Sequence, residues 1–129
     1  AKQHPIHAQL AAIANLRKAL PALQNGLQVN LDFDGDHAAF YRVIEQGEIA
    51  QTALVLLNKG DSAYRFSVAK YLEKGQWKEQ RYGNKSQVIK EGGTLVNVVD
   101  GHSVNVWVRE GRITSQAMLN ELTQLMAFK

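Results

Sequence analysis

The sequence predicts a mainly β protein: an antiparallel Greek-key β-sandwich, preceded by one amphipathic helix and followed by a short C-terminal helix. The strongest evidence lies in residues 52–61, where Ala53 to Leu57 are all apolar, as is typical of a strand covered on both faces. About seven short strand-like stretches are separated by glycine turns at roughly even spacing, which favours a sandwich. Both ends of the chain have helical apolar spacing instead.

The first predicted element is a helix over residues 5–20. Apolar side chains recur there every third or fourth residue and form one stripe. Pro5 suits the first helical turn, and Pro21 ends the helix because it lacks a backbone donor. The stripe consists of Ile6, Leu10, Ile13, Leu16 and Leu20.

The next residues predict a hairpin followed by the central strand. Residues 27–34 alternate, so the odd-numbered side chains up to Phe33 should point into the core. The turn Asp34-Gly35-Asp36 leads to a returning strand at residues 38–44. Gln46-Gly47 then turns the chain into the central strand.

Four further strands follow. In the first, Tyr64, Phe66 and Val68 should form the inner face, whereas residues 76–82 are polar enough to lie at a sheet edge. Asp100-Gly101 is a hairpin signal between the last two strands. In the closing strand, residues 103–109, the valines should share one face.

After Gly111 the spacing of apolar residues changes from that of a strand to that of a helix. Thr114 or Ser115 can cap a helix there. We therefore divide the chain into residues 1–26, 27–110 and 111–129. The apolar side of the final helix consists of Met118, Leu122, Leu125 and Met126.

Composition excludes several classes of protein. With 129 residues the chain is expected to form one domain with a real core. It has no cysteine, which excludes disulfides and thiolate metal sites, and no apolar run near the ~18 residues of a membrane span. Residues 65–90 are mostly basic, so binding to single-stranded nucleic acid is an alternative, although solvated strand faces explain the charges more simply.

No group of residues marks a catalytic or metal site. The chain lacks the G-x-S-x-G and phosphate-loop motifs. A calcium loop starting at Asp32 would require glycine and glutamate where the chain has His37 and Val43. The histidines His4, His7, His37 and His102 lack zinc-ligand spacing. We therefore predict no catalytic residue and no metal ligand.

Two aromatic residues are weak candidates for binding sugar. Trp77 and Tyr82 lie among lysines and glutamines on the expected edge strand, where sugar rings could stack on them. The alternative is that Trp77 packs over the sandwich edge. On the sugar-binding interpretation, the chain could be a free-standing carbohydrate-binding module.

Five segments resemble, in order and spacing, the C-terminal portion of glycoside hydrolase family 13, the α-amylase family. Leu16-Arg17, Pro21-Ala22-Leu23 and Gly26 resemble the end of the last helix of its catalytic (β/α)8 barrel. The other four resemble strands of the family's domain C. They are A-A-F-Y-R-V at 38–43, A-L-V-L-L-N at 53–58, Y-L-E-K-G-Q-W at 71–77 and G-H-S-V-N-V-W-V at 101–108.

The resemblance implies that residues 1–26 end a missing barrel and that residues 27–110 are domain C. The parent would cleave or transfer α-1,4-glucan chains by a retaining route, as cyclomaltodextrin glucanotransferases and bacterial α-amylases do. Because the family's catalytic acids lie upstream, no catalytic residue is carried over. The resemblance also implies a secreted or periplasmic protein, a parent that can hold calcium, and the catalytic barrel as partner, with α-glucan a further partner.

The chain starts Ala-Lys-Gln, without an initiator methionine or a signal-peptide pattern, and we expect it to be a fragment. In such a fragment the stripe of residues 5–20 lacks the barrel as a partner. It should then cover an apolar surface, most simply in a homodimer or against the C-terminal helix.

Overall fold

The computed structural model describes residues 26–46, 48–80 and 85–127. The predicted helix at residues 5–20 lies outside these ranges. The described elements are β1 (Leu27–Phe33), β2 (His37–Gln46), β3 (Ile49–Asn58), β4 (Tyr64–Val68), β5 (Gly75–Glu79), β6 (Ser86–Ile89), β7 (Leu95–Val99), β8 (Ser103–Glu110) and α3 (Gln116–Ala127).

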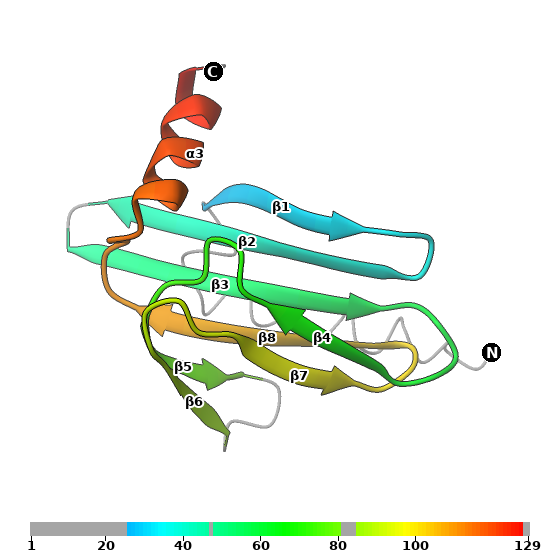
Figure 1. Cartoon of the computed structure of the whole chain (residues 1–129). Helices are drawn as coiled ribbons and strands as arrows, with labels where there is room; N and C mark the ends of the chain where they lie inside the picture. Colours follow the sequence, from blue (N-terminus) through cyan, green and yellow to red (C-terminus); the bar gives the residue numbers. More distant parts are fainter. Residues whose placement is uncertain (1–25, 47, 81–84, 128–129) are drawn as a thin grey trace.

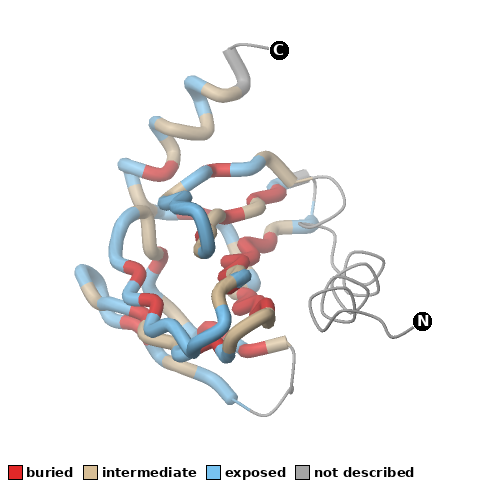
Figure 2. The backbone as a smooth tube through the Cα atoms, turned by 90° about the vertical axis from the view of Figure 1, so that its right-hand side faces the viewer, coloured by how far each residue is buried: buried red, intermediate tan, exposed pale blue. Residues whose placement is uncertain are grey.

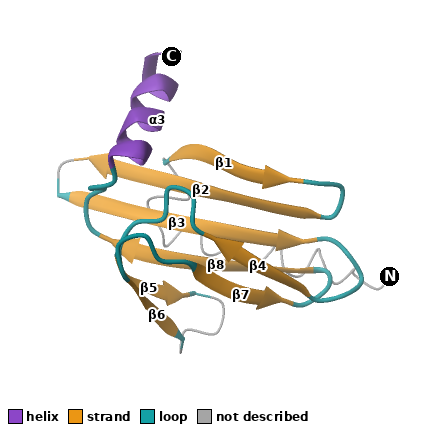
Figure 3. Cartoon of the chain, viewed as in Figure 1, coloured by secondary structure: helices purple, strands orange, loops and turns teal. Residues whose placement is uncertain are grey.

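The strands form two layers, which confirms the predicted antiparallel sandwich (Figures 1 and 3). The larger sheet has the order β1-β2-β3-β8-β5-β6, and the smaller sheet pairs β4 with β7. Every described strand pair is antiparallel. The helix α3 lies beside the start of β1. It packs on the same face of the larger sheet as the smaller sheet does.

The prediction of a central strand at residues 53–57 is confirmed. The strand β3 lies between β2 and β8, and Leu54 and Leu56 on one face are fully buried. Ala53 and Val55, on the other face, are 0% and 5% exposed. Figure 2 shows such buried positions gathered along the strands in the middle of the molecule. Both faces of the larger sheet are therefore apolar at its centre.

The main core lies between the two sheets. There Leu54, Leu56 and Trp107 from the larger sheet pack with Phe66 and Leu95 from the smaller one. The predicted alternation of β8 is correct, because Trp107 joins this core while the valines of β8 point to the opposite face.

Phe33 does not point into the core as predicted. The register between β1 and β2 shifts between Asn30 and Asp32, which is a β-bulge. The extra residue moves the side chains after it to the other face of the sheet. Phe33 is consequently 55% exposed and stacks on Phe40, with ring centroids 6.4 Å apart.

The prediction of an edge strand at residues 76–82 is wrong. The strand β5 lies between β8 and β6, and the additional strand β6 forms that edge. The sequence of β6, Ser-Gln-Val-Ile, is short and half polar, so it gave little strand signal. The exposed side chains of β5, Gln76 and Lys78, alternate with the buried ones, Trp77 and Glu79.

The turn at Asp100-Gly101 exists but does not close a hairpin. The strand β7 pairs with β4, whereas β8 pairs with β3 and β5 in the other sheet. Glycine is required at position 101 because an added Cβ would lie 2.4 Å from the carbonyl oxygen of Asp61. This turn therefore carries the chain from one layer to the other.

The start of α3 is fixed by Glu73, whose side chain is only 2% exposed. One carboxylate oxygen accepts hydrogen bonds from the Thr114 hydroxyl and backbone N–H (N···O 3.1 Å), and the other accepts from the Ser115 N–H (3.0 Å). The Ser115 hydroxyl in turn accepts from the backbone N–H of Met118 at 3.4 Å, in agreement with the predicted cap. Met118 is fully buried, so the helix is anchored at both the cap and the core.

Burial alone would raise the pKa of Glu73. The hydrogen bonds from Thr114 and Ser115 and the charge of Arg109 outweigh burial and lower the pKa below the usual 4.5. A lowered pKa means that the carboxylate stabilises the folded state fully above about pH 4.5. That stabilisation is lost as the pH falls through the lowered pKa.

Glu73→Gln should lower the free energy of unfolding at pH 7 by about 1–3 kcal/mol, because it removes the buried charged acceptor of the part-buried Thr114 and Ser115 donors. The difference from the unchanged protein should shrink as the pH falls below about 4.5. Urea denaturation across this pH range measures both effects. Glu91→Gln, at an exposed position, is the control. A difference that stays constant with pH would contradict the role given to the Glu73 charge.

Candidate functional site

The structure places Trp77 in the core rather than on the surface. Its side chain is fully buried, its ring lies 6.4 Å from that of Tyr41, and its indole N–H donates to the Glu73 carbonyl at 2.9 Å. A ring buried in this way cannot stack on a sugar, so the packing alternative describes Trp77. Tyr82, the other sequence candidate, lies outside the described residues.

The remaining sequence candidates do not form a site in the described part of the chain. The stripe Ile6, Leu10, Ile13, Leu16 and Leu20 lies outside the described residues. Within residues 26–46, 48–80 and 85–127, no three histidine, aspartate or glutamate side chains are grouped as metal ligands. No helix among them is long and apolar enough to span a membrane.

A groove that the sequence did not reveal lies on the side of the sandwich where β4 faces β1 and β2. It has a volume of about 210 Å³. Three aromatic rings line it, those of His37, Tyr64 and Phe66. Asp32, Ser67 and Lys70 also line it.

Within the described residues, one face of the Tyr64 ring is stacked on another ring and the opposite face is not. His37 stacks on Tyr64 with ring centroids 3.6 Å apart, and Phe66 meets Tyr64 edge-on at 4.8 Å. The ring centroids of His37 and Phe66 are 6.1 Å apart. The three centroids therefore form nearly a right triangle, with the right angle at Tyr64. Phe66 therefore lies beside Tyr64 and not over its second face. Tyr64 is 36% exposed.

The β1–β2 turn fixes the His37 ring in this stack. One Asp34 oxygen accepts the backbone N–H groups of Asp36 (2.8 Å) and His37 (2.7 Å), and the other lies 3.0 Å from His37 Nδ1. The backbone hydrogen bond from Asp36 and the bonds from His37 lower the pKa of Asp34. The carboxylate thus stays ionised and orients the imidazole toward Tyr64.

The opposite end of the groove is held by Tyr41 in the core. The Tyr41 hydroxyl donates to the Lys70 carbonyl at 2.8 Å, and burial raises the pKa of the phenol. The Lys70 ammonium lies 5.1 Å from the centroid of the Tyr71 ring. Both ends of the groove are therefore attached to fixed elements.

The chemistry of the groove fits an uncharged ligand with many hydroxyl groups. The lining residues include one acid, Asp32, and one base, Lys70, so neither sign of charge dominates. A polyanion would require clustered Arg or Lys, whereas Lys70 is the one Lys or Arg among the described residues that line the groove. Tyr64 and Phe66 were predicted as core residues, and they line a groove because the smaller sheet has only two strands.

No protein-family model matches the sequence, and no curated protein sequence matches it. Solved structures do match the fold. An Anoxybacillus α-amylase matches 80% of this chain with TM-score 0.62 and 21% identity, over 22% of its own length. A cyclomaltodextrin glucanotransferase with a three-domain ABC distribution matches 77% with TM-score 0.54 and 24% identity, over 21% of its own length.

An α-galactosidase from Mortierella vinacea also matches, over 74% of this chain and 27% of its own, with TM-score 0.53 and 14% identity. The chain thus spans about a fifth to a quarter of these enzymes. At such identities the likeness establishes a fold shared with a part of α-amylases and cyclomaltodextrin glucanotransferases.

Proposed function

We propose that this chain is a non-catalytic β-sandwich domain of an α-glucan-active enzyme, a starch or maltodextrin hydrolase or transglycosylase. In that enzyme it stabilises the catalytic barrel and contacts glucan through the groove at Tyr64. The observation that carries the proposal is the fold match to α-amylases and cyclomaltodextrin glucanotransferases, with the chain covering only about a fifth of each.

Because an α-galactosidase also shares this fold, the fold alone does not determine the substrate. The choice of α-glucan is supported by the family-13 segments in the sequence. These segments include the stretch before the first strand, which resembles a barrel helix.

The buried acids support a non-catalytic role. A retaining glycosidase needs two carboxyl groups on either side of a site that admits the sugar. Glu73 and Glu79 are each 2% exposed. Glu73 accepts hydrogen bonds from Thr114 and Ser115 of its own chain, and Glu79 is as buried as Glu73. Neither can reach a substrate.

The groove supports contact with glucan. A glucose ring presents C–H groups on its faces and hydroxyls around its rim. Tyr64 offers an aromatic face for the former, while the lining residues Asp32 and Lys70 carry an acceptor and a donor for the latter. A site of this size accommodates a short part of a chain, so binding should be weak.

Tyr64→Ala should weaken binding of maltoheptaose about 2- to 12-fold, because an aromatic contact contributes about 0.5–1.5 kcal/mol beyond its area. Isothermal titration of the purified chain measures this, with circular dichroism to verify folding. Val98→Ala is the control: Val98 is 57% exposed and pairs with Arg65 on β4, so it lies on the smaller sheet's other face. Equal affinity in the Tyr64 variant, or equal binding of cellohexaose, would contradict a glucan site in the groove.

A further inference from the structure

One edge of β4 faces the groove at Tyr64. The smaller sheet has only two strands, so β4 pairs with β7 on one side, while its other edge faces β1 and β2 across the groove. In an antiparallel ladder, successive residues direct their backbone N–H and C=O groups alternately toward the partner strand and away from it. The phase of this alternation decides which backbone groups of β4 face the groove.

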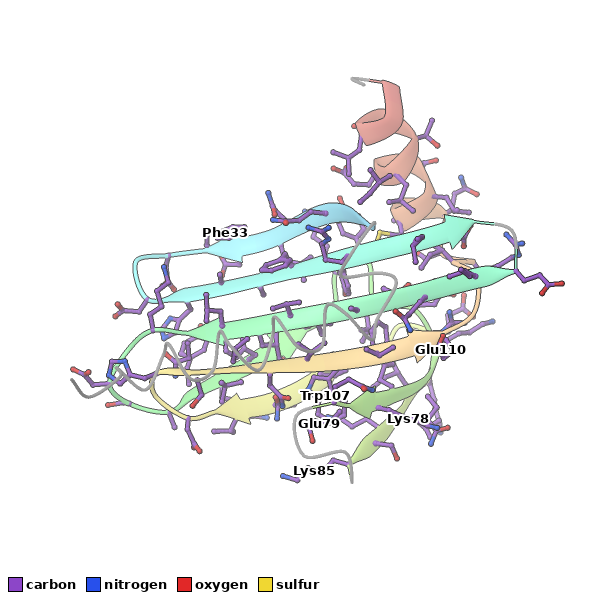
Figure 4. All side chains as sticks on the ribbon, turned by 180° about the vertical axis from the view of Figure 1, so that it is seen from behind. Phe33, Lys78, Glu79, Lys85, Trp107 and Glu110 are labelled. Carbon is purple, nitrogen blue, oxygen red and sulfur yellow. The ribbon has the colours of Figure 1, made fainter. Side chains whose placement is uncertain are left out.

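A hydrogen bond from β6 to β7 indicates the phase. The Val96 carbonyl of β7 accepts from the Gln87 side chain of β6 at 2.8 Å. The strands β1 and β6 are opposite edges of the larger sheet (Figure 4, in which Phe33 ends β1 and Lys85 precedes β6). Because β4 lies on the β1 side, at the groove, β7 has β6 on its far side. The Val96 carbonyl therefore points away from β4.

A second hydrogen bond gives the same phase. The carbonyl of Val99, the last residue of β7, accepts from Asn58 Nδ2 at 3.0 Å. The same nitrogen donates at 2.9 Å to the carbonyl of Ser62, just before β4. The Val99 carbonyl therefore points toward β4. It lies three residues after Val96, and an odd separation requires opposite directions.

The N–H and C=O groups of Arg65 and Ser67 consequently face the groove edge. Ser67 lies opposite Val96, and Arg65 lies opposite Val98. Because the groups of these valines point away from β4, those of their partners point away from β7. In the described part of the chain, neither Arg65 nor Ser67 has a hydrogen bond to any further element.

Ser67 lines the groove through its backbone. Along β4, Phe66 and Val68 are buried toward the core, so the exposed side chains of Arg65 and Ser67 point to the outer face. Ser67 is nevertheless among the residues that line the groove. What it presents there is its peptide N–H and C=O.

Two contacts tie β4 to the larger sheet and leave this edge free between them. His37 stacks on Tyr64 at the start of β4, and the Tyr41 hydroxyl donates to the Lys70 carbonyl beyond its end. The free edge between these contacts is residues 65–67, shorter than the about 5–6 residues of a usual strand. Its outer groups lie about 6.8 Å apart along the strand. They suit a ligand with hydroxyls spread along its length better than an added strand.

We propose that the free edge of β4 is the hydrogen-bonding wall of the groove. There the backbone N–H and C=O groups of Arg65 and Ser67 bind hydroxyl groups of an oligosaccharide that stacks on Tyr64. A hydroxyl can donate to a peptide carbonyl and accept from a peptide N–H. Because the strand already fixes these groups, binding them immobilises no flexible side chain. The proposal rests on the proposed function and identifies the groups that orient the sugar.

Ser67→Pro tests the proposal, because proline removes the N–H at the free edge and leaves the bonds to β7 in place. We expect the variant to fold and to bind maltoheptaose about 2- to 12-fold more weakly, the loss expected for one hydrogen bond. Isothermal titration measures the affinity. The control is Ser67→Ala, which loses the hydroxyl but keeps the N–H and should bind like the unchanged chain. Equal affinity in the two variants would overturn the proposal.

Amide hydrogen exchange tests the open edge without sugar. The Ser67 amide should exchange at least about 10-fold faster than that of Phe66, which faces β7, and saturating maltoheptaose should slow it. Slow Ser67 exchange in the free chain would overturn the proposal even if Ser67→Pro did not fold. Protection that rises with protein concentration and not with sugar would assign the edge to strand pairing between copies, and would overturn it too.

The same samples separate the two proposals. An unchanged chain that binds no maltoheptaose would overturn the proposed function and this inference together. Normal maltoheptaose binding by folded Ser67→Pro would overturn this inference alone.

Discussion

Replacing Leu56 by alanine should lower the free energy of unfolding by about 2–5 kcal/mol. Leu56 is fully buried in the main core, and its neighbours on the flanking strands are Ala39 and Asn105. Neither neighbour is large enough to fill the space left by the isobutyl group. The loss is a large part of the about 5–15 kcal/mol that stabilises a typical domain.

Urea denaturation of the Leu56→Ala variant measures this effect, with Thr94→Ala as control. Thr94 is exposed between β6 and β7, so its variant should change stability by less than about 0.5 kcal/mol. Equal losses in the two variants would show that β3 is not the centre of the core.

Replacing Trp77 by alanine should cost about 3–5 kcal/mol, because it empties the largest buried side-chain volume on β5. The change also removes the hydrogen bond from the indole N–H to the Glu73 carbonyl. Since Glu73 holds the start of α3 through Thr114 and Ser115, the C-terminal helix should loosen as well.

Trp77→Phe separates a core role from a sugar-binding role. It keeps an aromatic ring but loses the indole donor, so stability should fall by about 1–3 kcal/mol. Maltoheptaose affinity of the folded variant should stay unchanged. A fold as stable as the original combined with weakened sugar binding would mean that Trp77 is a binding platform after all.

Sequence patterns predicted those parts of the fold that depend on local alternation. The apolar run at Ala53–Leu57 identified the central strand, and the cap predicted at Thr114 or Ser115 identified the start of α3, because both signals lie within a few residues. Phe33 was misplaced because a single bulge between Asn30 and Asp32 reverses the faces of β1. Nothing in the alternation of β1 announces that bulge.

The remaining features, the burial of Trp77 and the groove at Tyr64, depend on pairing between strands that are far apart in the sequence. Trp77 sits among polar neighbours, and only the positions of β6 and β8 on either side of β5 make it a core residue. The groove depends on how far a two-stranded sheet extends over a six-stranded one, which brings Tyr64 beside His37 from a different layer. Such contacts have no local signature, so the sugar-binding candidates from the sequence missed the groove.

A single titration tests the central claim, that this domain contacts α-glucan without acting on it. Maltoheptaose is added to the isotope-labelled chain, and NMR spectra follow both the protein amides and the anomeric protons of the sugar. We expect amide shifts at Tyr64, Ser67 and Lys70, and maltoheptaose that stays intact over days. Shorter or longer maltooligosaccharides that accumulate with the repurified 14.4 kDa chain would contradict the account, as would saturating sugar that leaves the groove amides unmoved.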